Sequence, residues 1–203
     1  GTLKEAKLIE KIGKNGKLKL YTGTEATEST VKAQHSPKVL HLATHGFFLE
    51  DTQRLSGDDK SRGIGGITKM GNEDLMNIPA LNGSPEIHNP LLRSGLAFSG
   101  ANRLAENMTI PENEDDGILT AMEVTGMDIY GTDLVVLSAC ETGLGEVQKG
   151  EGVSGLRRAF KIAGANNIIM SLWSVPDEET SWLMEDFYKS YFKGESASVS
   201  LNK

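Results

Sequence analysis

The sequence predicts an α/β fold in which a mostly parallel sheet lies between layers of helices. Three short apolar runs, which begin at Val39, Leu134 and Ile168, have the length and composition of buried strands. Segments with helical spacing of apolar residues lie between and after these runs, as the crossover connections of parallel strands require. No internal repeat is present.

The amino-acid composition and the net charge argue against several classes of function. The chain has 203 residues, enough for one domain with a buried core, and its single cysteine excludes an internal disulfide. The four histidines show no zinc-ligand spacing, so we expect no metal and no cofactor. The net charge of −7 opposes a phosphate backbone, and we expect no nucleic acid partner. The single cysteine indicates a reducing, cytoplasmic location. No apolar stretch approaches the roughly 20 residues of a membrane span and no signal peptide opens the chain, so we expect no membrane contact. The abrupt ends suggest a fragment of a longer protein.

The first half of the chain contains four expected elements before a long insertion. Leu3, Ala6, Ile9 and Ile12 predict a helix over residues 2–12, and alternation predicts a strand over 17–21. A capping box, Thr22 to Glu25, predicts a helix that runs to about Gln34, followed by the strand 39–44.

Residues 50–117 read as an insertion or lid region with one strand near 91–99. Its part 50–89 is rich in Gly, Asp, Asn and Lys, and we expect a solvated loop there. A self-cleavage segment is the alternative, because a structureless loop of about forty residues is uncommon in a compact domain.

The second half alternates strands and helices. A capping box from Thr120 to Glu123 opens a short helix, and the strand 134–139 follows it. A helix comes next, then the strand 168–173, and a last helix begins at Asp177. The buried faces of these two helices are expected to carry Val153, Leu156, Phe160 and Ala163 in the first, and Leu183, Met184, Phe187, Tyr188 and Tyr191 in the second.

Two strands end on side chains that can do chemistry. Cys140 follows the run 134–139, and His45-Gly46 follows the run 39–44. Because the carboxyl ends of parallel strands meet at one edge of a sheet, we expect the thiol and the imidazole to form a nucleophile and its base. Cys140 would attack a peptide carbonyl while His45 protonates the leaving amine, with the N–H groups of Gly46 and Cys140 as the oxyanion hole. Taken alone, Cys140 would be a small buried hydrophobe.

The other candidate groups are weaker. His41 lies in mid-strand and is expected in the core or behind the site, while His35 and His88 flank loops and are expected to be solvated. Gly150-Glu-Gly152-Val-Ser-Gly155 matches the spelling of a dinucleotide fingerprint, with Asp177 about twenty residues on. Its first glycine lies some ten residues past the preceding strand, and the spacing can arise by chance in a chain with 23 glycines, so nucleotide binding is only the third interpretation.

Several strings together resemble one family, the CHAT-domain proteins, which are related to caspases and separases. They are His41-Leu-Ala-Thr-His45-Gly46, Asn89-Pro-Leu-Leu-Arg-Ser-Gly-Leu-Ala97, Asp116-Gly-Ile-Leu-Thr-Ala121, Leu137-Ser-Ala-Cys-Glu-Thr-Gly143, Gly150-Glu-Gly152 and Ser171-Leu-Trp-Ser-Val-Pro-Asp177. The resemblance implies a caspase-like α/β fold, with Cys140 as nucleophile, His45 as base and Gly46 at the oxyanion hole. It also implies a protein substrate, a bacterial origin and an upstream tetratricopeptide-repeat or other regulatory region as partner.

The chain departs from caspases around the cysteine. Ser138, Glu141 and Thr142 stand where the caspase pentapeptide has Gln, Arg or Gln, and Gly, which speaks against aspartate specificity. The separation from His45 to Cys140 is 140 − 45 = 95 residues, against about 50 in caspases. The stretch that ends at Asp177 resembles a separase segment whose aspartate binds a basic side chain. Asp177 therefore predicts cleavage after Arg or Lys, with a helix N-cap as the alternative role.

These observations predict a caspase-like cysteine endopeptidase that works through a thioester on Cys140. A non-proteolytic interaction module with the same fold is the alternative. A nucleotide-binding α/β domain is the third.

Overall fold

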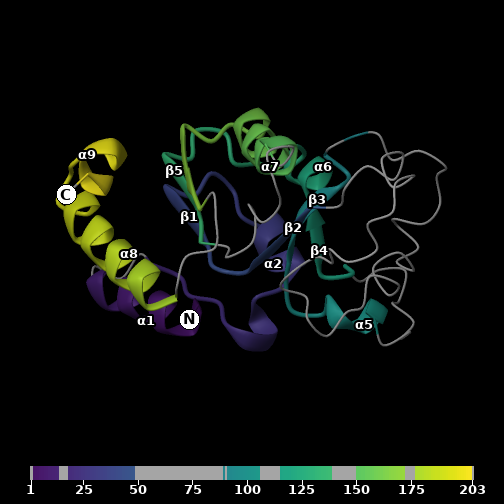
Figure 1. Cartoon of the computed structure of the whole chain (residues 1–203), viewed down its shortest axis with the longest axis horizontal. Helices are drawn as coiled ribbons and strands as arrows, with labels where there is room; N and C mark the ends of the chain where they lie inside the picture. The colour runs from purple at the N-terminus through teal and green to yellow at the C-terminus, as the bar shows by residue number, and fades with distance from the viewer. Residues whose placement is uncertain are drawn as a thin grey trace, which may run out of the picture.

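The computed structural model describes residues 2–13, 18–48, 89, 91–105, 115–138, 150–171 and 177–202 (Figure 1). The predicted loop 50–89 lies outside these residues except for Asn89, so neither of its two interpretations is tested.

A parallel three-stranded sheet forms the centre of the fold. Its strands are β1 (Val39–Leu42), β5 (Leu134–Leu137) and β6 (Asn167–Met170), in the order β1-β5-β6, and both pairs are parallel. All four residues of β5 are buried because this strand has a neighbour on each side and helices on both faces. The three strands expected from the apolar runs are therefore confirmed, but β1 and β5 end two residues earlier than predicted, and β6 ends three residues earlier and begins one residue earlier.

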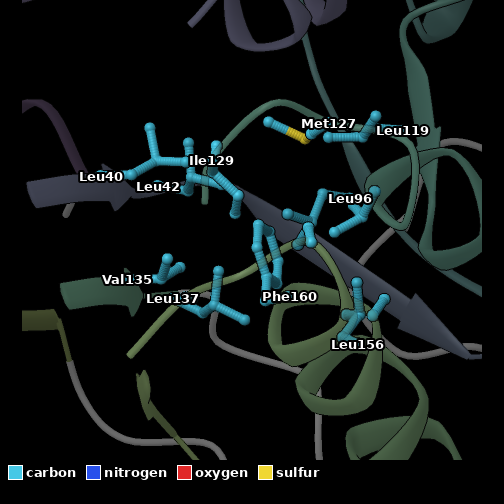
Figure 2. Close-up of a cluster of buried hydrophobic side chains, with 14 of the residues drawn as sticks. Leu40, Leu42, Leu96, Leu119, Met127, Ile129, Val135, Leu137, Leu156 and Phe160 are labelled. Atoms are coloured by element: carbon cyan, nitrogen blue, oxygen red, sulfur yellow. The ribbon is translucent and has the colours of Figure 1, made fainter. Parts of the chain in front are cut away.

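Helices cover both faces of this sheet, as predicted for an α/β sandwich. On one face, Leu134 and Val136 pack with side chains of α1 (Thr2–Ile12) and α8 (Asp177–Tyr191). On the other, Val135 and Leu137 pack around Phe160 of α7 (Gly150–Ile162) (Figure 2). Figure 1 shows α1 and α8 together on one side of β1 and β5, with α7 on the opposite side.

A second, antiparallel sheet adjoins the first. It contains β2 (His45–Phe48), β3 (Ser94–Ala97) and β4 (Ile118–Thr120), in the order β2-β3-β4. β3 confirms the strand expected near 91–99, whereas β2 and β4 were not predicted. Only glycine fits at position 95, because a Cβ there would lie 2.7 Å from both Leu119 O and Phe47 Cζ.

The expectations for residues 17–34 are partly wrong. Residues 18–22 form no strand, and the Thr22 side chain caps nothing in the short 3₁₀ turn η1 (Gly23–Glu25). The α-helix here is α2 (Glu28–Lys32), and it begins later because the Thr27 hydroxyl accepts from Thr30 N at 3.1 Å. By contrast, the capping box predicted at Thr120 forms and opens α6 (Ala121–Val124).

The buried faces of two helices differ from the prediction at single positions. In α1 the buried residues are Glu5 and Ile9, and the expected Leu3 is exposed. In α8, Met184, Phe187 and Tyr188 are buried as expected, but Leu183 is exposed. The remaining short helices are α5 (Asn102–Ala105) and α9 (Ala197–Leu201), which the Ser196 hydroxyl caps. Within the described ranges no helix has both the length and the apolar character to cross a membrane.

Candidate functional site

The carboxyl edge of the parallel sheet is set by the register of β1 and β5. Leu42, the last residue of β1, pairs with Leu137, the last residue of β5. The pairing continues one step further, since Ser138 N donates to Leu42 O at 3.0 Å. The two strands therefore end side by side, and whatever follows each of them starts from the same edge.

His45 follows β1 after two residues and begins β2. His45 pairs with Ala97 in the antiparallel sheet, and its side chain is exposed. The preceding Thr44 donates its hydroxyl to Ala97 O, which ties the link between β1 and β2 to β3. Gly46, the predicted oxyanion-hole residue, is buried opposite Leu96. The imidazole is thus open to solvent beside the edge where β1 ends.

The other two predicted site residues are not described at the side-chain level. Cys140 lies in the stretch 139–149, outside the described residues. Asp177 is the first residue of α8, which confirms the predicted helix start, but its side chain is not described. The pairing of Cys140 with His45 and the pocket role of Asp177 therefore stay predictions.

A buried polar cluster lies on the α1–α8 face of the same edge, and we call its four residues, Glu5, His41, Ser138 and Tyr188, the Glu5 cluster. The Ser138 hydroxyl donates to Glu5 Oε2 at 2.9 Å, and His41 Nε2 lies 3.2 Å from Glu5 Oε1. The other ring nitrogen of His41 is 2.9 Å from the Tyr188 hydroxyl. Burial raises the pKa of Tyr188 far above its ordinary value, and the charge of Glu5 adds to this shift. Tyr188 is therefore un-ionised.

The sequence identified only part of this cluster. His41 is expected in the core or behind the site, and its part-buried side chain lies in mid-strand beside Glu5 and Tyr188, which agrees with a core position. Glu5 was missed because a carboxylate on the apolar face of a helix contradicts the usual burial pattern unless it is paired. The usable signal was its spacing of four residues from Ile9, which places both on one face of α1.

A second polar cluster ties α2 to the start of β4 and to α6. Lys32 forms ion pairs with Glu28, Asp115 and Glu123. Glu28 is 2% exposed, and its Oε2 also accepts from Gly117 N at 3.0 Å. Burial raises the pKa of Glu28 from 4.5 to about 7, although the hydrogen bond from Lys32 acts in the opposite direction.

Hydrogen bonds from Lys32 also lower the pKa values of the neighbouring Glu123 and Asp115. Burial alone would raise the pKa of Glu123, but hydrogen bonds from Lys32 and Thr120 bring it below its ordinary value. The pKa of Asp115 is lowered by hydrogen bonds from Ser29 and Lys32. This cluster is an anchor for α2. Among the described residues, no three His, Cys, Asp or Glu side chains are grouped so that they could hold a metal ion.

The remaining sequence candidates lie away from the edge or outside the described residues. His35 is exposed and lies 3.0 Å from Asp128, as expected for a solvated side chain, while His88 is not described. Gly150 is the first residue of α7, so Gly152 and Gly155 lie inside a helix. A dinucleotide fingerprint needs its glycines in the turn that precedes the helix, and this segment does not provide them there.

Comparison with known proteins adds a family assignment. The family model described as "CHAT domain" matches residues 1–203. Human "Tetratricopeptide repeat protein 28" is 28% identical over 141 residues, which cover 64% of this chain and 5% of that protein. The mouse protein of the same name is 35% identical over 86 residues, which cover 42% of this chain and 3% of that protein. The chain thus spans only a small part of these relatives, which are mammalian and give no support for a bacterial origin. No solved structure matches the chain.

Proposed function

Because the chain belongs to the CHAT-domain family, whose fold is that of caspase-like peptidases, we propose that it is a cysteine endopeptidase with Cys140 as nucleophile and His45 as general base and acid. One observation carries the proposal: the pairing of Leu42 with Leu137. His45 is the third residue after Leu42, and Cys140 is the third residue after Leu137. Each lies the same number of residues beyond two strand ends that are hydrogen-bonded neighbours.

Chain length limits how far the two side chains can separate. Neighbouring strands lie about 4.8 Å apart, and three residues span at most about 10 Å. Both groups therefore start from points close to each other at one edge, and the exposed imidazole of His45 is accessible to a substrate. A thiol beside an imidazole ionises more readily than a free thiol and becomes the stronger nucleophile at neutral pH.

The reaction follows from these two groups. The Cys140 thiolate adds to the carbonyl carbon of the scissile bond, and the oxygen gains the negative charge, which the N–H groups of Gly46 and Cys140 would stabilise. The C–N bond then breaks as the His45 imidazolium gives its proton to the departing amine, leaving a thioester. His45 next takes a proton from water as the water oxygen bonds to the thioester carbonyl carbon. The C–S bond then breaks, which releases the carboxylic acid and returns the Cys140 thiolate and the His45 imidazolium.

Substrate and partner extend the proposal. The substrate is a protein, and Asp177 at the start of α8 would bind an Arg or Lys side chain ahead of the cut bond. The matched relatives are named for tetratricopeptide repeats, which supports a repeat region as the regulatory partner of this domain.

Cleavage-site profiling tests the proposal. The chain is incubated with a diverse peptide library, and new termini are identified by mass spectrometry for the unaltered protein, Cys140→Ala, His45→Ala and His35→Ala. We expect cuts from the unaltered protein and from His35→Ala, which changes an exposed histidine paired with Asp128, and none from the other two.

The outcomes separate the alternatives. Cuts that persist in Cys140→Ala would refute the assignment of the nucleophile. A lack of cuts from the unaltered chain would favour an interaction module that keeps the fold without turnover. Cuts after Leu or Met at the same rate as after Arg or Lys would remove the pocket role of Asp177.

A further inference from the structure

Burying the polar side chains of the Glu5 cluster carries an unfavourable desolvation free energy. Glu5 is 3% exposed and Ser138 is 6% exposed. A carboxylate removed from water is destabilising unless its oxygens are paired. Here Oε2 accepts from Ser138, while Oε1 lies 3.2 Å from His41 Nε2 with no hydrogen bond between them. The Tyr188 hydroxyl holds the other side of the His41 ring. The four side chains come from α1, β1, the residue that follows β5, and α8.

The position of the cluster argues against a role in stability alone. Leu134 and Val136 precede Ser138 on the same face of β5, and both pack in the apolar core with Ile9 and Phe187. An apolar residue at position 138 would extend this core, and replacing buried ion pairs with well-packed apolar groups is often neutral or stabilising. Along β5, the side chains that face α1 and α8 are apolar at Leu134 and Val136, and the polar Ser138 follows directly after the last residue of the strand.

Ser138 is held twice. Its backbone N–H donates to Leu42 O on β1, and its side chain donates to Glu5 on α1. It is also the last described residue before Cys140, which follows two positions on. We propose that Glu5 is a positioning residue for Cys140, because it holds Ser138 and so fixes the point from which the chain runs to the nucleophile.

This inference rests on the proposed function, since it concerns the geometry of the proposed Cys140–His45 pair. A functional group must be held within about 0.5 Å of its productive position, and a misplacement of 1 Å can cost about a hundredfold in rate. Loss of the Ser138–Glu5 bond would let the end of β5 move on the α1 face while the bond to Leu42 stays. The thiol would then align less well with His45, and less of it would be ionised at neutral pH.

Thiol alkylation tests the inference without a substrate, and the chain offers a single cysteine to label. The rate of reaction with iodoacetamide is measured across the pH range for the unaltered protein, Ser138→Ala, Glu5→Gln and His45→Ala. We expect Ser138→Ala and Glu5→Gln to slow alkylation at neutral pH by about tenfold and to raise the apparent thiol pKa. Ser138→Thr, which keeps the hydroxyl, should restore most of the rate.

Two controls separate positioning from stability. Glu10→Gln changes an exposed carboxylate on the same helix, and Ile9→Val loosens the packing of α1 without removing any of the four polar side chains. Both should leave the alkylation profile unchanged, while thermal unfolding shows that Ile9→Val lowers stability.

Each result has one reading. If alkylation slows in Ile9→Val as much as in Ser138→Ala, the effect follows stability and the inference is overturned. If His45→Ala slows alkylation but Ser138→Ala and Glu5→Gln do not, the proposed pair stands and the positioning role of Glu5 falls. If His45→Ala has no effect, the proposed pair itself is refuted, and the inference is refuted with it.

Discussion

Between pH 5.5 and pH 8 we expect the free energy of unfolding to fall because the Glu28 carboxyl ionises. Replacing Glu28 with glutamine should remove most of this fall. Glu28 is buried and bonded to Lys32 and to Gly117 N. Burial raises its pKa from 4.5 to about 7 in the folded protein, so between these two values the folded state binds a proton that the unfolded state has released. The stabilising contribution is therefore present below about pH 4.5 and is lost as the pH rises through 7.

The magnitude follows from the two pKa values. Linkage gives a difference of about 2 kcal/mol in the free energy of unfolding between pH 5.5 and pH 8, with the protein more stable at the lower pH. The lowered pKa values of Asp115 and Glu123 act with the opposite sign, but mainly below about pH 4.5, outside this window. Lys32 keeps two carboxylate partners after the substitution, so the cluster should survive it.

The assay is urea unfolding followed by tryptophan fluorescence at both pH values. Glu28→Gln should flatten the difference, while Glu25→Gln, an exposed carboxylate in the preceding turn, should leave it unchanged. A protein that is equally stable at both pH values, or a Glu28→Gln variant that keeps the full difference, would refute the reasoning.

Two further predictions concern the core and one turn, and both are measured by chemical denaturation at neutral pH. Gly117 has φ +83°, and a Cβ there would lie 2.4 Å from Ala101 N, so Gly117→Ala should lower the free energy of unfolding by about 2 kcal/mol or more. Unchanged stability would show that this loop shifts freely. Phe160 of α7 is fully buried against the parallel sheet (Figure 2), so Phe160→Ala should lower the free energy of unfolding by about 3 to 5 kcal/mol. A loss below 1 kcal/mol would contradict the central place assigned to this ring.

The central sheet could be predicted because its middle strand, β5, is buried on both faces and the two strands beside it are also mostly apolar. Such strands read as continuous apolar runs, and Leu134 to Leu137 is a clear case. The antiparallel sheet was harder. Its strands are short, and β2 contains His45 and Gly46, which have no strand signature and were interpreted as a strand end. Their strand conformation depends on pairing with β3, which lies about fifty residues later in the chain.

At the candidate site, too, features set by neighbouring residues in the sequence were predictable, and features set by contacts between distant residues were not. That His45 follows a strand at the carboxyl edge was predictable, because the strand itself was. The Glu5 cluster was not, because it joins α1 to β5 across 133 positions in the sequence. A glutamate among apolar residues has a physical explanation only when its partners, Ser138 and His41, are known.

The two sheets change how the proposed site must be understood. The sequence places His45 and Cys140 after two strands of one sheet, yet His45 belongs to the antiparallel sheet and only Ala43 and Thr44 lie between it and β1. The Thr44 hydroxyl donates to Ala97 O on β3, so this short link is bonded to the second sheet. On the other side of the edge, Ser138 is bonded to β1 and to α1. The distance between base and nucleophile therefore depends on the relative orientation of the two sheets. The hydroxyl of Thr44 anchors the chain just before His45, and the hydroxyl of Ser138 anchors the chain just before Cys140. Neither hydroxyl exchanges a proton in the proposed reaction.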